Sequence, residues 1–172
     1  MTTARDLALT AMDVAPGRPV EPGDLSLALA GAELIDLLAG GAVTLDGDRI
    51  VPGERTAMGD PVLDQAVRAL SREAPYEAVG DWLWRRGRGL ASVYAADLGA
   101  EDRSAANEPV LVALAQAVGI GEEGTEEVPV EAGDAVETVL AAVYDAVMEL
   151  EAVRQRRAVE QSAFDNIWRG DD

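Results

Sequence analysis

Residues 24–51 read DLSLALAGAELIDLLAGGAVTLDGDRIV, and this stretch decides the fold class. Asp24 is of a residue type that caps helix N-termini, and Gly40 and Gly41 supply a natural helix end. Between them the apolar residues recur with helical spacing, which predicts one long apolar helix. The positions of its apolar face are Leu27, Leu34, Ile35, Leu37 and Leu38.

Shorter elements are predicted around that helix. Residues 43–51 contain Asp46-Gly47, a dipeptide that suits a tight turn between two short strands. Asp60-Pro61 has the N-cap and first-turn pattern of another helix. The remaining elements are a short helix or strand over 4–13, a helix that contains Val79 and ends near Gly87, a helix from Pro109 to Gly119, and a long helix over about 134–160.

The last long helix carries apolar residues at alternating intervals of four and three. This spacing is typical of a seam between two helices. The seam residues are Val136, Leu140, Val143, Val147 and Leu150. The pattern leaves two alternatives open, because the seam can pack within the chain or against a second copy in a homodimer.

The composition favours helices over sheets. Apolar residues make up 48% of the chain and aromatic residues only 4%, so the core must consist largely of Ala, Leu and Val packed between helices. We therefore expect a mainly α fold, a helical bundle with surrounding short helices and one small β-hairpin. The length fits a single domain over 1–172. Within it, the acid-rich segment 121–133 is interpreted as a flexible loop rather than an acidic binding motif.

Several classes of chemistry are excluded by missing residue types. The chain has no cysteine and no histidine, and all 14 of its basic residues are arginine. This excludes disulfides, Cys/His zinc sites, Ser-His-Asp triads and lysine Schiff bases. Close acid pairs such as Glu33 and Asp36 are interpreted as solvated helix surface. We expect no catalytic residues, no metal site and no cofactor, and hence no enzyme.

The net charge limits the partners of the protein. A formal charge of −18 repels polyanions, so we expect no nucleic-acid partner. The same charge weakens attraction to an anionic bilayer unless a confined site provides it. The most apolar stretch, 25–45, contains Glu33 and Asp36, which argues against a transmembrane segment. We expect a cytoplasmic protein with peripheral contact at the inner face of the membrane.

One short segment is locally cationic. Residues 81–88 read DWLWRRGR and bring together two tryptophans and three arginines. Arginine binds phosphate through two parallel hydrogen bonds, and tryptophan favours membrane interfaces. The predicted lipid-binding residues are Trp82, Trp84, Arg85, Arg86 and Arg88. The alternative is structural: Trp82 lies in the core, Trp84 is half-buried, and the arginines pair with surrounding acids.

Several stretches in order resemble the Golgi phosphoprotein 3 family. They are DLALTAMDVAPGRPV, LALAGAELIDLLAGGAVTLDGDRIV, MGDPVLDQAVRAL and DWLWRR, followed more faintly by EPVLVALAQAVGI. The lysine-free composition, rich in Ala, Gly and Arg, is consistent with a bacterial, actinobacterial member. The resemblance implies a helical bundle ringed by shorter helices and hairpins. It also implies a non-catalytic adaptor that binds phosphatidylinositol 4-phosphate or another anionic phospholipid.

The chain departs from the family pattern at the headgroup site. The resemblance puts Ala30 where the family has an arginine on the first core helix, and Ala91 and Tyr94 where it has paired arginines. About fifty residues that carry an apolar insertion hairpin are missing between Leu98 and Asp102, and stable anchoring usually needs two such signals. We expect residual lipid binding, or instead a protein-interaction module or dimer without lipid.

Overall fold

The computed structural model describes residues 2–13, 20–54, 57–98, 109–120 and 133–169, and it describes their side chains except at positions 109 and 165–169. The described chain is mainly helical with one small hairpin, so the predicted fold class is confirmed. Its elements are α1 (Thr3–Asp13), α2 (Pro22–Ala39), β1 (Val43–Asp46), β2 (Arg49–Pro52), α3 (Pro61–Ala69), α4 (Val79–Arg86), α5 (Leu90–Asp97), α6 (Pro109–Ala117) and α7 (Asp134–Arg169). The predicted loop 121–133 lies outside the described residues except for Gly133.

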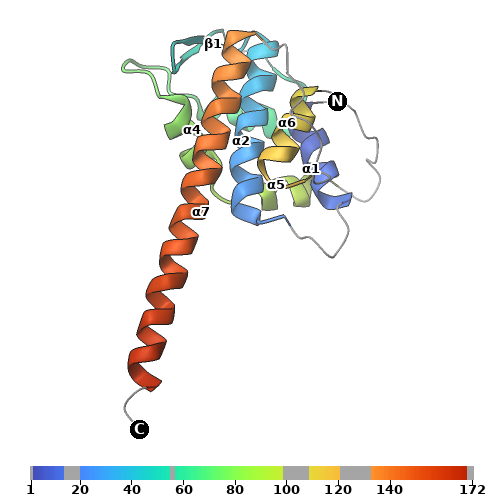
Figure 1. The fold of residues 1–172 in the computed structure, drawn as a ribbon. Helices are drawn as coiled ribbons and strands as arrows, with labels where there is room; N and C mark the ends of the chain where they lie inside the picture. The colour runs from blue at the N-terminus through green and yellow to red at the C-terminus, as the bar shows by residue number, and fades with distance from the viewer. Residues whose placement is uncertain (1, 14–19, 55–56, 99–108, 121–132, 170–172) are drawn as a thin grey trace.

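Helix α2 lies at the centre of the molecule (Figure 1). Helices α1, α4, α5, α6 and α7 all pack against it, which buries α2 on nearly every side. This explains why the segment is apolar all round rather than amphipathic. Helix α7 approaches α2 closely at Gly31, because a Cβ added there would lie 2.3 Å from Cγ2 of Val143.

The start of α2 differs from the prediction. The helix begins at Pro22, with Glu21 as the N-cap residue, and the backbone N–H of Leu25 donates to the carbonyl of Glu21 at 3.0 Å. Proline suits the first helical turn because its φ is already helical and it has no N–H to leave unpaired. Asp24 is therefore not the cap. Its carboxylate instead accepts hydrogen bonds from Arg154 of α7 at 2.7 and 2.9 Å.

The other local predictions are confirmed where the structure describes them. Strands β1 and β2 pair antiparallel with Val43 opposite Pro52, and the turn glycine Gly47 has a φ of 59°. Asp60 caps α3, because its Oδ1 accepts hydrogen bonds from the N–H groups of Val62 and Leu63 at 2.8 and 3.1 Å. The N-terminal segment is a helix rather than a strand.

Helix α5 was not predicted. Helix α4 ends at Gly87, as expected, but the chain turns at once and begins α5 after Gly89, whose φ is 70°. A positive φ costs glycine little, so only three residues are needed between the end of α4 and the start of α5. Gly87 also fits tightly, because an added Cβ would lie 2.6 Å from the carbonyl oxygen of Leu83.

Helix α7 resolves the alternative left open for the seam. The helix packs within the chain against α2, α4 and α6. Of the predicted seam residues, Leu140 and Val143 are buried and the others are half-buried against the core, while Val139 and Ala146 beside them are also buried. The seam therefore packs internally. The helix is also longer than predicted, because it continues to Arg169 and extends away from the body (Figure 1).

Candidate functional site

The five predicted site residues lie on α4 and on the turn that leads into α5. Trp82 points into the core and is 0% exposed, and its indole N–H donates to the backbone carbonyl of Ala30 on α2 at 3.2 Å. The side chain thereby fixes α4 on the central helix and satisfies its one polar group. Trp82 is therefore a core residue, as the structural alternative predicts.

Arg86 is held by a buried carboxylate. Its Nε and one terminal nitrogen donate to the two oxygens of Glu33 on α2 at 2.7 and 2.9 Å, a paired geometry typical of strong arginine–carboxylate contacts. The same guanidinium reaches the carbonyl of Val62 at 3.3 Å. Glu33 is 0% exposed, so its interpretation as solvated helix surface is wrong. Burial raises the pKa of the Glu33 carboxyl, and the Arg86 guanidinium opposes that rise.

The Glu33–Arg86 pair is the centre of a larger polar network. The hydroxyl of Tyr94 on α5 lies 3.3 Å from Oε1 of Glu33, and burial followed by the Glu33 charge raises the pKa of that phenol. Both partners of the hydrogen bond are fully buried. The acid of Glu33 thus links α2, α4 and α5, and each of its oxygens is already bonded to Arg86.

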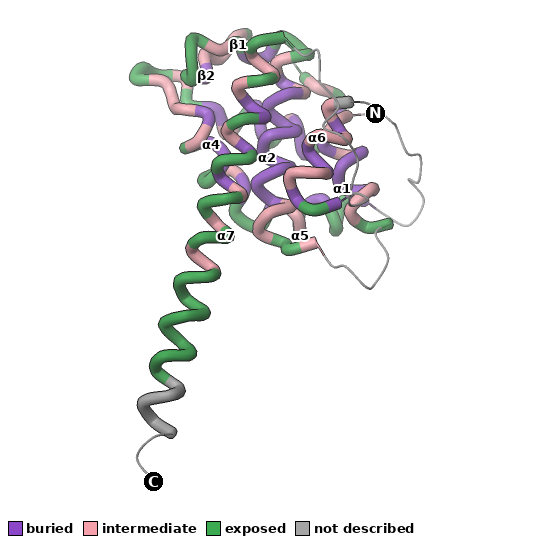
Figure 2. Tube along the Cα trace, in the orientation of Figure 1, coloured by how far each residue is buried: buried purple, intermediate pink, exposed green. Residues whose placement is uncertain are grey.

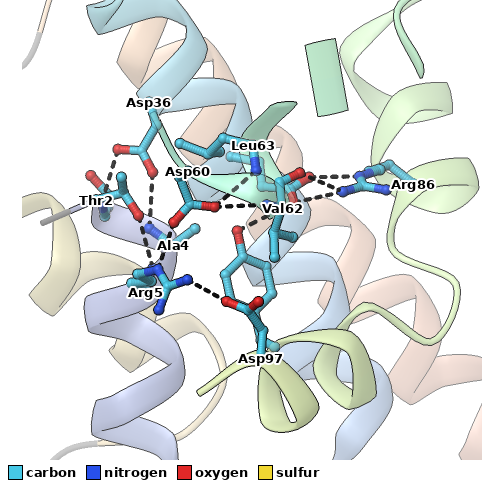
Figure 3. Close-up of polar contacts among 12 residues, drawn as sticks. Thr2, Ala4, Arg5, Asp36, Asp60, Val62, Leu63, Arg86 and Asp97 are labelled. Carbon is cyan, nitrogen blue, oxygen red and sulfur yellow. Dashed lines mark hydrogen bonds and ion pairs between the residues drawn. The ribbon is translucent and has the colours of Figure 1, made fainter. Parts of the chain in front are cut away.

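A second group of polar contacts holds the first turn of α1 (Figure 3). Arg5 forms ion pairs with Asp60 at the start of α3 and with Asp97 at the end of α5. The Asp36 carboxylate accepts hydrogen bonds from the backbone N–H groups of Thr3 and Ala4 at 2.9 and 3.0 Å. Asp36 thus satisfies N–H groups of α1 from another helix, and it too is not a freely solvated acid.

Burial and hydrogen bonding shift the pKa values of these acids in opposite directions. Burial raises the pKa of Asp36, and the hydrogen bonds from Ala4 and Thr3 only partly offset it. Burial would also raise the pKa of Asp60, but the hydrogen bond from Arg5 and those from the Leu63 and Val62 amides outweigh it and lower that pKa. The carboxylates of Asp36 and Asp60 therefore connect neighbouring helices.

Arg85 lies on the surface but is occupied by internal contacts. Its guanidinium donates to both oxygens of Glu77 at 2.7 Å and to the carbonyl of Ala69 at 3.0 Å. Its central carbon also lies 5.2 Å from the centre of the Trp82 ring, a cation–π distance. The Glu77 hydrogen bond raises the pKa of Arg85.

The last two predicted residues, Trp84 and Arg88, meet at a groove. Trp84 is 36% exposed, Arg88 is exposed, and both line a cavity of about 320 Å³. No described residue forms an ion pair with Arg88. The cavity is mainly apolar, and its other walls are Pro22, Gly23, Ser26 and Leu27 of α2, Gly87, Gly89, Ala91 and Ser92 of the α4–α5 region, and Leu150 of α7.

The five residues therefore do not form one surface. Trp84 and Arg88 come together at the groove, Arg85 lies on the surface in contact with Glu77, and Trp82 and Arg86 point inward. Sequence reasoning missed the α2 and α7 walls, because nothing local links positions 22 and 150 to this turn. One signal did exist for the network, since Glu33 is an acid inside the most apolar stretch of the chain.

Two further features concern metals and membranes. The described residues contain no cluster of three or more acids that could hold a metal ion. Among the helices described, none has the length and apolar character needed to cross a bilayer.

Comparison with known proteins confirms the resemblance. A family model described as Golgi phosphoprotein 3 (GPP34) matches residues 4–159, a range that runs from the first turn of α1 into the extended part of α7. The searches among curated proteins and among solved structures returned no match. Because the family match spans most of the chain, the chain belongs to the Golgi phosphoprotein 3 (GPP34) family.

Proposed function

We propose that the protein is a non-catalytic adaptor that binds the phosphate headgroups of anionic phospholipids weakly, at the groove beside Trp84 and Arg88. The observation that carries the proposal is an exposed arginine, without an ion pair to any described residue, next to an exposed indole at the mouth of an apolar groove. Arginine suits a phosphate, and the indole suits the interface between headgroups and acyl chains. Phosphatidylinositol 4-phosphate is the headgroup that the family resemblance implies.

The position of the groove supports this assignment. Ala91, which stands where the family resemblance places a headgroup arginine, is one of the groove residues. The other two substituted positions, Ala30 and Tyr94, are buried here, and Tyr94 is bonded to Glu33. Only one of these three positions thus lies at the groove, and it carries no cation here, so we expect weak binding.

The charge of the whole chain sets the conditions for binding. A net charge of −18 opposes approach to an anionic bilayer, and salt at physiological strength screens this repulsion beyond about 8 Å. A single arginine near an anionic surface contributes about 1 kcal/mol. We propose peripheral and reversible attachment at the cytoplasmic face of the membrane.

Flotation with lipid vesicles tests the proposal. The wild type is mixed with neutral phosphatidylcholine vesicles, with vesicles that also contain phosphatidylglycerol, and with vesicles that also contain phosphatidylinositol 4-phosphate. We expect co-flotation with one or both anionic vesicles and not with neutral ones. Arg88→Ala should reduce the bound fraction about fivefold, which corresponds to about 1 kcal/mol, and Trp84→Ala should also reduce it.

Arg68→Ala is the matched control, because Arg68 is an exposed arginine of α3 that does not line the groove. It should float like the wild type. Arg86 is unsuitable for this test, since its loss would leave the buried Glu33 without its ion-pair partner. Equal flotation of the wild type and Arg88→Ala would reject the groove as the lipid-binding site. If the wild type floats with neither anionic vesicle, lipid binding is rejected, and the alternative is an adaptor that acts through protein contacts alone.

A further inference from the structure

The outer part of α7 extends beyond the packed body of the protein. Burial along the helix ends near Leu150 and Val153, which are half-buried, and residues 155–164 are all exposed (Figure 2). This exposed part includes apolar side chains, with Val159 at 69% and Phe164 at 62% exposure. An isolated helix of this length is only marginally stable in water, so packing against a partner would stabilise it.

The exposed part continues the same face that is buried nearer the body. The buried positions Val139, Val143 and Ala146 are followed at alternating intervals of four and three by the half-buried and exposed ones. The continuing positions are Leu150, Val153, Arg157, Glu160 and Phe164. Such spacing keeps all of them along one side of a helix and is typical of a seam between two helices.

The order of side chains along this face is self-complementary. From Val153 to Phe164 it reads apolar, positive, negative, apolar. When two copies run antiparallel about a point between residues 158 and 159, Val153 meets Phe164 of the partner subunit. In the same register Arg157 meets the partner subunit's Glu160, and the reverse contacts follow by symmetry.

We propose that the protein forms an antiparallel homodimer through Val153, Arg157, Glu160 and Phe164 of α7. Two apolar contacts at the ends enclose two ion pairs at the centre. Neither Arg157 nor Glu160 has an ion pair with a described residue of its own chain, so both charges are available to a second copy. The central charges define register and orientation more than they strengthen the contact.

Charge argues against a parallel pair. In a parallel arrangement Arg157 would face the partner subunit's Arg157, and Glu160 would face Glu160 of the partner subunit. The two acidic bodies would also lie side by side. In the antiparallel arrangement the bodies sit at opposite ends of the paired segment, and Leu150 to Phe164 spans about 21 Å at 1.5 Å per residue. This is more than twice the screening length of about 8 Å at physiological salt.

The proposal concerns a different surface from the Val136–Leu150 seam, which the body already covers. It also uses neither Trp84 nor Arg88, so vesicle flotation and dimer formation test separate residues. Loss of one would leave the other intact.

Charge reversal measured by analytical ultracentrifugation tests the interface. We expect the wild type to show a monomer–dimer equilibrium in the micromolar range. Arg157→Glu alone and Glu160→Arg alone should each weaken dimerisation by at least tenfold, because each places two like charges opposite each other. An equimolar mixture of the two variants should dimerise again, as should the double variant Arg157→Glu/Glu160→Arg.

Arg156→Glu is the matched control, because Arg156 is an exposed neighbour that lies off the proposed face. It should dimerise like the wild type. All substituted positions are exposed, so circular dichroism should show unchanged folding. A wild type that stays monomeric up to near-millimolar concentration would overturn the proposal, and so would an Arg157→Glu variant that dimerises normally.

The orientation of the two helices is tested separately by disulfide cross-linking. Because the chain contains no cysteine, only the introduced cysteines can form a disulfide. Val153→Cys and Phe164→Cys proteins are mixed and oxidised. The antiparallel pair brings these two positions together, so the mixture should give a disulfide-linked dimer in higher yield than either variant alone. Higher yield from a single variant alone would indicate a parallel pair and contradict the proposed arrangement.

Discussion

Several charged residues of the described chain connect helices to one another. Arg86 and Glu33 join α4 to α2, and Arg5 joins α1 to the start of α3 through Asp60. Removing one member of a buried pair leaves the other charge unpaired, which is why such residues are poor reporters of surface binding. Arg88, in contrast, is exposed at the groove and can be substituted without disturbing the core.

Asp60→Asn gives a prediction about pH. The variant keeps an oxygen that can cap α3 but loses the charge paired with Arg5. Because the pKa of Asp60 is lowered on folding, its ionised form stabilises the protein above the ordinary pKa of 3.8, and this contribution disappears as pH falls through the folded-state pKa. We expect the variant to be less stable by about 1–2 kcal/mol at neutral pH.

Urea unfolding at a series of pH values measures this difference. The difference in the free energy of unfolding should stay constant from neutral pH to near 3.8 and shrink as the pH falls further. A difference between Asp60→Asn and the wild type that does not shrink below pH 3.8 would contradict the proposed role of the Asp60 charge.

At the level of elements, the fold depends on how closely α7 approaches α2. Gly31 allows this contact, because a side chain there would overlap Val143 of α7. The same contact directs α7 along α2 and past its first turn, where Arg154 meets Asp24. The direction of the outer helix is therefore set by packing in the core.

Gly31→Ala should lower the free energy of unfolding by about 1–3 kcal/mol, since the new methyl group would overpack the α2–α7 contact. Adding Val143→Ala should recover part of the loss by making room. Gly80→Ala in α4 is the control, because a Cβ there meets no atom within 4 Å and alanine favours helix. Urea unfolding measures all three, and a Gly31→Ala protein as stable as the wild type would disprove the close contact.

At the level of the whole molecule, one acidic body carries a long helix that leaves it at the groove. Leu150 belongs to both features, because it lines the cavity and is half-buried near the point where burial along α7 ends. The body contains the tightly packed part of α7, and the outer part is surrounded by solvent (Figure 2). Local stability should therefore fall along this one helix.

Hydrogen exchange followed by mass spectrometry measures that gradient. In dilute protein, amides of 139–146 should be strongly protected because they lie in the core, and amides of 155–164 should exchange rapidly because tertiary packing does not protect them. Raising the protein concentration should slow exchange only in the outer segment. Equal protection of both segments at low concentration would contradict the exposed position of the outer helix.

The start of α3, the hairpin turn and the central helix can be predicted from the sequence alone, because they depend on neighbouring residues. Asp60-Pro61 starts α3, Asp46-Gly47 turns the hairpin, and the apolar run identifies the central helix, because capping, turn geometry and periodicity act over a few positions. The missed helix α5 shows the limit of such signals. The sequence predicts a helix end near Gly87, and only the tertiary structure shows that Gly87 and Gly89 form a tight corner between two helices.

Which charged side chains can bind a partner depends on the tertiary fold. Arg85, Arg86 and Arg88 look alike in the sequence, yet Glu77 binds the first, Glu33 binds the second, and the third opens onto the groove. Glu33 and Arg86 are 53 positions apart, so no local pattern could pair them. The physical reason is that desolvation and ion pairing depend on which side chains folding brings together, whereas helix formation depends mostly on neighbours in the chain.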